Sequence, residues 1–222
     1  MNTQYTDKDD TYFASARFDV LDRLPNNTKT ILDVGAGQGN FLKKVKQKLN
    51  CETWGVELEK KAYLKAVENV DKIFLGTVED NLQNLPDNYF DCITFNDVLE
   101  HLIDPSDVLE KIKFKLKKDG VVVASMPNMR FIFSMKKVIW DLVIKKDWIY
   151  EDSGIMDRTH LHFYTKKTIV EMFEKSDYEV IDIRGTNTTD NWKLKLLNLL
   201  TFNHFEDSSH LQYIVTGKLK NA

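Results

Sequence analysis

The sequence has few of the features that mark secreted, cysteine-clustered or membrane-spanning chains. Two cysteines, Cys51 and Cys92, occur in 222 residues, and neither belongs to a Cys-x-x-Cys pair. Zinc-cluster and thioredoxin-type chemistry are therefore not indicated. Residues 1–10 are polar and acidic and do not contain the apolar core of a signal peptide. The longest apolar run, residues 131–144, is too charged to insert into a bilayer. We expect a cytoplasmic protein.

An excess of charge of one sign is also absent. The formal net charge is −3, which gives no global electrostatic case for binding nucleic acid. Two lysine-rich runs, residues 43–48 and 111–118, are interrupted by apolar residues at helical spacing. They indicate solvated helix faces, with a partner-binding patch as the alternative. A hydrophobic share of 42% is enough to fill one core, so we expect a single domain over residues 1–222.

Strand and helix patterns alternate along the chain. Predicted strands cover residues 30–34, 52–57, 72–75, 90–95, 121–126, 179–184 and 212–218. Predicted helices cover residues 11–24, 40–49, 60–70, 105–118, 131–144, 166–175 and 191–200. This alternation is typical of a parallel sheet with helices on both faces. We therefore predict an α/β, Rossmann-like fold of seven strands, with a helical insert after the fifth strand.

The most informative segment joins the first strand to the helix that follows it. It reads Asp33-Val34-Gly35-Ala36-Gly37-Gln38-Gly39. Alternating glycines let the backbone approach a ligand that a Cβ atom would repel, and the helix start beyond them offers unpaired N–H groups. The spacing G-x-G-x-G differs from the G-x-G-x-x-G of nicotinamide and flavin sites. Glu57 ends the second strand, where an acid can accept both ribose hydroxyls; a surface acid is the alternative.

Five motifs in order resemble those of class I S-adenosylmethionine-dependent methyltransferases. They are the glycine turn at residues 33–39, LPDNYFD at 85–91, NDVLEHL at 96–102, KKDG at 117–120 and SMPN at 125–128. The resemblance extends over approximately residues 10–220. It implies a mostly parallel seven-stranded sheet with an antiparallel last strand and a substrate-side insert at residues 128–160. It also implies S-adenosyl-L-methionine as the cofactor and S-adenosylhomocysteine as a product.

The resemblance further implies a set of cofactor contacts. These are Asp33, Gly35, Gly37, Gly39, Glu57, Leu58, Val78, Glu79, Asn96, Tyr12 and Arg17. Asp33, the glycines and Asn96 would meet the methionine part, Glu57 the ribose hydroxyls and Leu58 the adenine face.

The adenine contacts depart from the family pattern, and the contacts of Arg17 and Tyr12 have an alternative interpretation. Thr77 stands where the family usually has an Asp that meets the adenine amino group, so Val78 or the acids after it would take that role. Arg17 would pair with the cofactor's carboxylate and Tyr12 would cover it. Alternatively, both residues decorate an amphipathic helix.

A histidine-rich stretch, residues 157–164, suggests the catalytic side. If it is extended, His160, His162 and Tyr164 share one face. Histidine titrates near neutrality and suits a general base. We predict that His162, His160 and His101 are catalytic; structural histidines bound to loop carbonyls are the alternative. Zinc or iron held by His160, His162 and Asp157 is a third interpretation. We expect no metal, because no further ligand stands at a firm spacing.

The same stretch, DRTHLHFYT, resembles a methyltransferase subgroup found in polysaccharide and O-antigen gene clusters. We therefore predict in-line O-methylation of a small-molecule or sugar hydroxyl. A nicotinamide-dependent oxidoreductase and a non-catalytic cofactor-binding partner protein are the alternatives. The insert also carries the aromatic residues Phe131, Phe133, Trp140, Trp148 and Tyr150. They would line a substrate cleft, pack an oligomer interface or anchor the insert.

Overall fold

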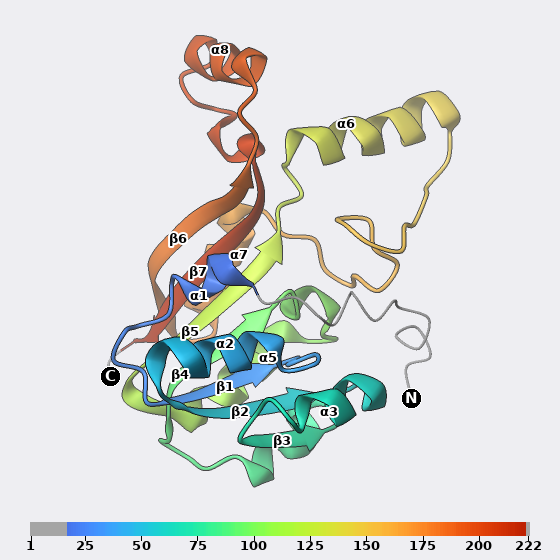
Figure 1. Cartoon of the computed structure of the whole chain (residues 1–222). Coiled ribbons are helices and arrows are strands. Elements are labelled where there is room, and N and C mark those ends of the chain that lie inside the picture. The colour runs from blue at the N-terminus through green and yellow to red at the C-terminus, as the bar shows by residue number, and fades with distance from the viewer. Residues whose placement is uncertain (1–16, 221–222) are drawn as a thin grey trace.

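A seven-stranded sheet forms the centre of the computed structural model, which describes residues 17–220 (Figure 1). The strand order is β3-β2-β1-β4-β5-β7-β6. The strands are β1 (Thr30–Val34), β2 (Glu52–Glu57), β3 (Lys72–Leu75), β4 (Phe90–Asn96), β5 (Leu116–Pro127), β6 (Tyr178–Thr188) and β7 (His210–Leu219). β1 to β5 pair in parallel, whereas β7 is antiparallel to both β5 and β6. The predicted sheet with an antiparallel last strand is confirmed.

Helices cover both faces of this sheet. They are α1 (Phe18–Leu21), α2 (Asn40–Leu49), α3 (Lys60–Ala66), α4 (Val78–Asn81), α5 (Pro105–Ile112), α6 (Ile132–Trp140), α7 (Lys166–Lys175) and α8 (Trp192–Leu200). The apolar residues of α1 and α2 and the end of α3 pack on one face, and those of α5 and α7 on the other. Two separate hydrophobic clusters result, one on each side of the sheet.

Local sequence explains several helix starts. The Asp104 side chain accepts the N–H of Asp107 at 3.0 Å, and Pro105 occupies the first helical position of α5. Thr165 and Thr168 form a capping box at the start of α7.

The predicted helix over residues 105–118 is wrong beyond Ile112. A short 3₁₀ turn, Lys113–Lys115, follows α5, and β5 begins at Leu116. Leu116 is 1% exposed and pairs with Phe90 at the start of β4. Sheet pairing and burial therefore override the helix propensity of the lysine-rich segment. The helix predicted for residues 60–70 also ends early, at Ala66. Of the one predicted for residues 11–24, the described part contains the four-residue α1.

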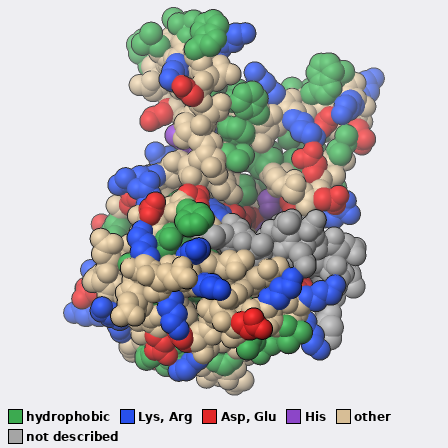
Figure 2. Space-filling model, in the orientation of Figure 1, with side chains coloured by type: hydrophobic (Ala, Val, Ile, Leu, Met, Phe, Trp, Pro, Cys, Tyr) green, Lys and Arg blue, Asp and Glu red, His purple; other side chains and the backbone are tan. Residues whose placement is uncertain are grey.

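Two helical segments project from the sheet (Figure 1). α8 caps the long ends of β6 and β7, and α6 continues into a π-helical turn, Asp141–Lys145. Apolar side chains gather on the outside of both projections (Figure 2). Trp140, Val143 and Leu200 are 57%, 63% and 69% exposed. Among residues 17–220, no helix combines the length and the apolar character needed to cross a membrane.

The segment from residue 128 to residue 164, which contains the predicted insert, is tied together at its ends. Asn128 and Tyr164 form an isolated parallel bridge, and the N–H of Met129 donates to the Tyr164 carbonyl at 2.8 Å. The chain therefore leaves the sheet and returns to it at one point beside the end of β5.

Candidate active site

The described candidate cofactor residues converge at the end of the sheet where the parallel strands terminate. Asp33, Glu57 and Asn96 lie at or next to the carboxyl ends of β1, β2 and β4, which are adjacent parallel strands. The strand order reverses between β1 and β4. In open α/β sheets, ligands bind at the carboxyl ends of the strands at such a reversal.

The glycine turn after β1 is locked to Glu57. Gly35, Gly37 and Gly39 have φ angles of 76°, 54° and 75°, in the left-handed region that favours glycine. The Gly37 N–H donates to Oε2 of Glu57 at 2.7 Å, and the Glu59 N–H donates to Oε1 at 2.7 Å. Glu57 is buried, and burial raises its pKa against these two hydrogen bonds. Each carboxylate oxygen keeps a further lone pair that can accept a hydroxyl.

Two of the three glycines are also required by packing. A Cβ at Gly35 would lie 2.5 Å from Cγ2 of Val98, and one at Gly39 would lie 2.8 Å from Cγ2 of Val70. Sequence reasoning attributed these glycines to the ligand alone, because Val98 and Val70 lie far along the chain.

Asp33, which is buried, and Asn96, which is half-buried, form a polar pair at the ends of β1 and β4. Oδ1 of Asp33 accepts hydrogen bonds from Oγ1 of Thr94 at 2.7 Å and from Nδ2 of Asn96 at 2.9 Å. Burial raises the pKa of Asp33 to about 7, and the two hydrogen bonds oppose this shift. Oδ1 of Asn96 is buried and has no hydrogen-bond partner within the described chain. Because buried polar atoms are normally paired, this oxygen is a candidate acceptor for a hydrogen bond from a ligand.

The residues predicted for the adenine side differ in exposure. Leu58 is 47% exposed and Val78 is buried, while Glu79 lies on the surface of α4. Thr77 caps α4: its hydroxyl accepts the Asp80 N–H at 3.1 Å and donates to Asp80 Oδ2 at 2.8 Å. The departure from the usual Asp at this position therefore has a structural role as a helix cap.

Arg17 lies at the end of β4, where its guanidinium forms ion pairs with Asp97 and Asp19. Asp97 also accepts hydrogen bonds from Ser125 Oγ and Gln212 Nε2, each at 3.1 Å. Asp97 was not among the predicted site residues. Its position directly after β4 could have indicated it, because ligands bind at the carboxyl ends of strands in such sheets. Tyr12 lies outside the described residues.

The predicted catalytic histidines stand at the same end of the sheet. The 3₁₀ turn η4 (Leu99–His101) follows β4, and the Glu100 carbonyl accepts the N–H groups of Leu161 and His162 at 2.8 and 3.1 Å. His101 and His160 stack edge to face, with ring centroids 4.8 Å apart. These pairings bring together two segments about 60 residues apart in the sequence.

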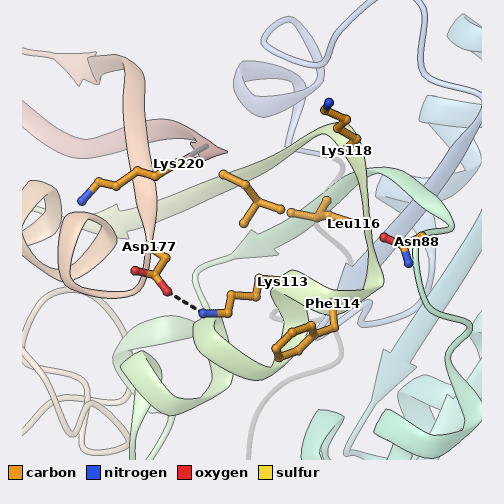
Figure 3. A pocket seen from close by; sticks show the side chains of 8 residues that line it. Asn88, Lys113, Phe114, Leu116, Lys118, Asp177 and Lys220 are labelled. Carbon is orange, nitrogen blue, oxygen red and sulfur yellow. Dashed lines mark hydrogen bonds and ion pairs between the residues drawn. The ribbon is translucent and has the colours of Figure 1, made fainter. Parts of the chain in front are cut away.

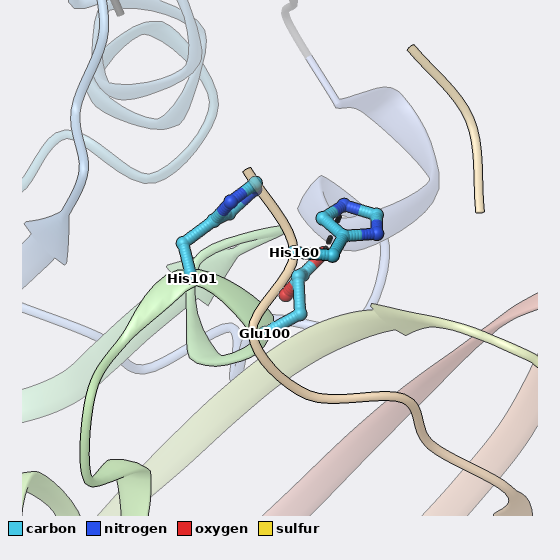
Figure 4. Close-up of side chains that lie close together, drawn as sticks. All are labelled: Glu100, His101 and His160. Atoms are coloured by element: carbon cyan, nitrogen blue, oxygen red, sulfur yellow. Dashed lines mark ion pairs between the residues drawn. The ribbon is translucent and has the colours of Figure 1, made fainter. Parts of the chain in front are cut away.

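Glu100 lies beside the two stacked rings (Figure 4). Nε2 of His160 is 4.0 Å from Oε1 of Glu100, which is 1% exposed. Burial and the nearby carboxylates of Asp97 and Asp157 raise the pKa of Glu100 well above its usual range. Neither carboxylate oxygen of Glu100 has a hydrogen-bond partner in the described structure. Sequence reasoning did not assign a role to Glu100.

The predicted alternation along residues 160–164 is present. Leu161 and Phe163 are 54% and 40% exposed, whereas Tyr164 is buried and its hydroxyl donates to the Leu99 carbonyl at 3.4 Å. His162 is half-buried and lies apart from the Glu100 cluster, with Nε2 3.3 Å from the Ile103 carbonyl.

The aromatic residues of the insert are largely exposed. Trp140, Trp148 and Tyr150 are 57%, 43% and 57% exposed. Trp148 and Tyr150 contact each other edge to face, with ring centroids 6.3 Å apart. A substrate cleft, an oligomer interface and an anchor for the insert all stay predictions for these residues.

A separate hollow lies at the opposite end of the sheet, where the parallel strands β4 and β5 begin (Figure 3). Its volume is about 560 Å³, and it is lined by Asn88, Lys113, Phe114, Leu116, Lys118, Asp177, Leu219 and Lys220. These residues precede β4, begin β5 and end β7. In this hollow, Nζ of Lys113 forms an ion pair with Oδ2 of Asp177 at 2.6 Å. The hollow is thus far along the strands from the glycine turn.

Comparisons with known proteins agree with this geometry. A family model described as a methyltransferase domain matches residues 8–183. A ubiquinone biosynthesis O-methyltransferase from Actinobacillus pleuropneumoniae serotype 7 is 30% identical over 123 residues, which are 50% of this chain and 52% of that protein. Its namesake from Aeromonas salmonicida is 26% identical over 165 residues, covering 72% of this chain and 66% of that protein. The chain thus spans about half the length of the first of these relatives.

A solved structure shows the same fold. An S-adenosylmethionine-dependent methyltransferase from Archaeoglobus fulgidus superposes with a TM-score of 0.68 at 18% identity, over 97% of each chain.

Proposed function

We propose that this chain, which belongs to the methyltransferase domain family, transfers a methyl group from S-adenosyl-L-methionine to a hydroxyl of a small molecule. The names of the curated relatives support an oxygen acceptor. A sugar hydroxyl is the second acceptor class that we retain, on the sequence resemblance of residues 157–165.

One observation carries the proposal. The end of β4 supplies Asn96, whose buried Oδ1 has no partner in the described chain. Four residues later comes Glu100, which clusters with His101 and His160. A residue proposed to bind the cofactor and a cluster of titratable side chains therefore follow the same strand, at the carboxyl ends of the strands where ligands bind. This arrangement supports a transfer between two bound molecules.

In the proposed complex, the chain holds the cofactor at this end of the sheet. The Glu57 carboxylate would accept the ribose hydroxyls, and the Gly35–Gly39 turn would face the methionine part. Asn96 Oδ1 and Asp33 would accept hydrogen bonds from the methionine ammonium group. When bound, S-adenosylmethionine supplies an electrophilic methyl group on a positively charged sulfur.

The protein's own contribution is alignment and proton removal. Holding the acceptor oxygen in line with the methyl group supplies most of the acceleration, because positive charge is lost during transfer and no new ion needs strong stabilisation. A hydroxyl acceptor must also lose its proton, and a positioned base contributes about 10²–10⁴-fold. His101, His160 and His162 are the proposed residues for this task.

Calorimetric titration with S-adenosylhomocysteine tests the cofactor half of the proposal. We expect saturable binding at one site per chain, and no quenching or energy transfer in a parallel fluorescence titration with NADH. A folded protein that binds NADH and not S-adenosylhomocysteine would establish the oxidoreductase alternative.

The acceptor half is tested with labelled S-adenosylmethionine. A panel of phenols, vicinal diols and free sugars is offered, and products gaining one methyl group are identified by mass spectrometry. We expect transfer to an oxygen of a phenol or diol. Transfer to nitrogen or carbon only would contradict the proposal, and binding of the cofactor with no turnover on any acceptor or in a cell extract would support a non-catalytic partner protein.

A further inference from the structure

We propose that Glu100, His101 and His160 form a binding site for a divalent transition-metal ion at the acceptor side of the active site. The site itself is inferred from these three side chains, whereas its part in catalysis rests on the proposed function. It departs from the sequence-based expectation, which considered Asp157 and His162 as ligands and favoured no metal.

The spacing of the three side chains fits one ion. One ligand atom from each of Glu100, His101 and His160 lies within 4.8 Å of the other two. Nitrogen and carboxylate ligands sit about 2.0–2.2 Å from zinc, so atoms that share one ion are at most about 4.4 Å apart. His160 Nε2 and Glu100 Oε1, 4.0 Å apart, already satisfy this limit. A small side-chain rotation would bring the remaining atoms within it.

The two imidazoles are held in the tautomer that a ligand needs. Nδ1 of His101 lies 3.0 Å from the Thr159 carbonyl, and Nδ1 of His160 lies 3.0 Å from the Ile155 carbonyl. A carbonyl oxygen only accepts, so Nδ1 carries the proton in each ring and the lone pair of a neutral ring is on Nε2. Metal-binding histidines characteristically donate their other ring N–H to a backbone carbonyl in this way.

Glu100 supplies an independent indication of a missing partner. Its side chain is 1% exposed, and both carboxylate oxygens lack a hydrogen bond within the described residues. A buried carboxylate without a partner is costly, and buried charges are paired or coordinate metals. The nearby carboxylates of Asp97 and Asp157 add negative charge to this region. Asp157 itself is occupied as an acceptor, with Oδ1 bound by the N–H and the hydroxyl of Thr159 at 2.9 and 2.7 Å.

The backbone around the cluster is pinned, which favours a preformed site. The Glu100 carbonyl accepts two N–H groups from residues 161 and 162, and the His101 N–H donates to the Val98 carbonyl at 2.9 Å. The ligands thus come from one short turn and one strand-like segment that are bonded to each other. A ligand set held in this way loses little entropy when an ion binds.

The donor set indicates the class of ion. Two imidazoles and one carboxylate suit zinc, iron, cobalt and nickel better than magnesium or calcium, which prefer oxygen ligands alone. Three protein ligands leave coordination positions open. An acceptor hydroxyl in such a position would lose its proton more readily. In the transfer, the C–O bond forms and the S–C bond breaks with its electron pair going to sulfur. The hydroxyl proton goes to His162 or to solvent, because with the ion bound at Nε2 and a proton on Nδ1 neither His101 nor His160 can accept it.

The test uses the full chain without a histidine tag, treated with a chelator and titrated with Co²⁺ while its visible absorption is followed. We expect one Co²⁺ per chain, displaced by Zn²⁺. Glu100→Gln keeps the side-chain shape and should weaken Co²⁺ binding by at least about 10-fold, the loss typical of even an outer partner. His204→Ala is the matched control, because His204 is exposed and outside the cluster; its affinity should equal that of the wild type.

Absence of Co²⁺ binding by the wild type at millimolar concentration, or equal binding by Glu100→Gln, would overturn the metal site. If circular dichroism shows that Glu100→Gln does not fold, His160→Asn is measured instead. S-adenosylhomocysteine binding is titrated on the same metal-free samples. Retained cofactor binding without Co²⁺ binding rejects the metal site alone, whereas Co²⁺ binding without cofactor binding rejects the proposed function alone.

Discussion

Glu57, the last residue of β2, accepts the backbone N–H of Gly37 at 2.7 Å. The carboxylate and the glycine turn therefore form one unit, in which the residue proposed to bind ribose also fixes the backbone of the turn. Changes at Glu57 should affect ligand binding and local order together.

We expect Glu57→Ala to weaken S-adenosylhomocysteine binding by roughly 10–100-fold, because hydrogen bonds to a charged group are worth about 1.5–3 kcal/mol each. Calorimetry measures the change. Glu68→Ala, at an exposed acid in the turn after α3, is the control and should bind as the wild type does. Unchanged affinity in Glu57→Ala would remove this residue from the cofactor site.

Gly35→Ala should destabilise the fold through a steric clash with Val98. The new Cβ would lie 2.5 Å from Cγ2 of Val98 at a φ of +76°. We expect a loss of about 2–4 kcal/mol, combining overpacking with the cost of a left-handed alanine. Gly154→Ala separates the two causes, because Gly154 has a φ of +83° and nothing within 4 Å of its would-be Cβ. It should cost only about 1–2 kcal/mol in denaturant unfolding. Equal losses in the two variants would show that the clash is relieved.

The pH dependence of stability should carry a contribution from Asp33. Burial raises its pKa in the folded protein to about 7 from 3.8. Between these values the unfolded chain ionises while the folded one keeps the proton, so the folded state binds more protons and stability falls as pH rises. The slope is up to about 1.4 kcal/mol per pH unit, and it vanishes above pH 7. Glu57 and Arg17 are the charged groups that influence Asp33.

Unfolding free energies of the wild type and Asp33→Asn, measured from pH 4 to pH 8, test this contribution. The difference between the two curves should change up to pH 7 and then become flat. A difference independent of pH would mean that the pKa of Asp33 is the same in the folded and the unfolded protein.

The three histidines should differ in their effect on transfer. His160 belongs to the Glu100 cluster, so His160→Ala should lower kcat by at least about 10²-fold and leave S-adenosylhomocysteine affinity unchanged. His162 contacts the Ile103 carbonyl instead, and we expect a smaller loss in His162→Ala. Steady-state kinetics with the identified acceptor measures both. A greater loss in His162→Ala would restore the sequence-based assignment of His162 as the main base.

Arg17→Ala distinguishes two roles for this residue. The ion pair with Asp97 predicts a stability loss of about 1.5–3 kcal/mol. A double-mutant cycle with Asp97→Asn should recover most of that loss as coupling energy. If Arg17 instead binds the cofactor carboxylate, as the sequence resemblance implies, S-adenosylhomocysteine affinity will fall while the coupling with Asp97 is small.

Much of the fold could be predicted because its signals are local. The strand over residues 30–34 and the helix over residues 40–49 have the predicted bounds, since apolar periodicity and a glycine turn determine them. The end of α5 at Ile112 could not be predicted, because the pairing of Leu116 with Phe90 depends on a distant strand.

The candidate site divides in the same way. The ends of β1 and β2 follow from adjacent sequence, so Asp33 and Glu57 were identified together with the turn. The meeting of His101 with His160 depends on how the insert returns to the sheet, and no local pattern encodes that return. Glu100 acquires significance only from this meeting, because its burial beside the two rings is not encoded in any local sequence pattern.

Because Asn128 and Tyr164 are bridged, the segment between them could be replaced by one of a different length or sequence without moving the sheet. Both ends meet at one point, so a longer or shorter segment changes the entropy of closing this loop only slowly with length. His160 lies inside the exchangeable part, whereas Glu57 and the glycine turn lie outside it. Acceptor preference can therefore diverge among related chains by replacement of this one segment, while the proposed cofactor contacts at β1 and β2 stay as they are.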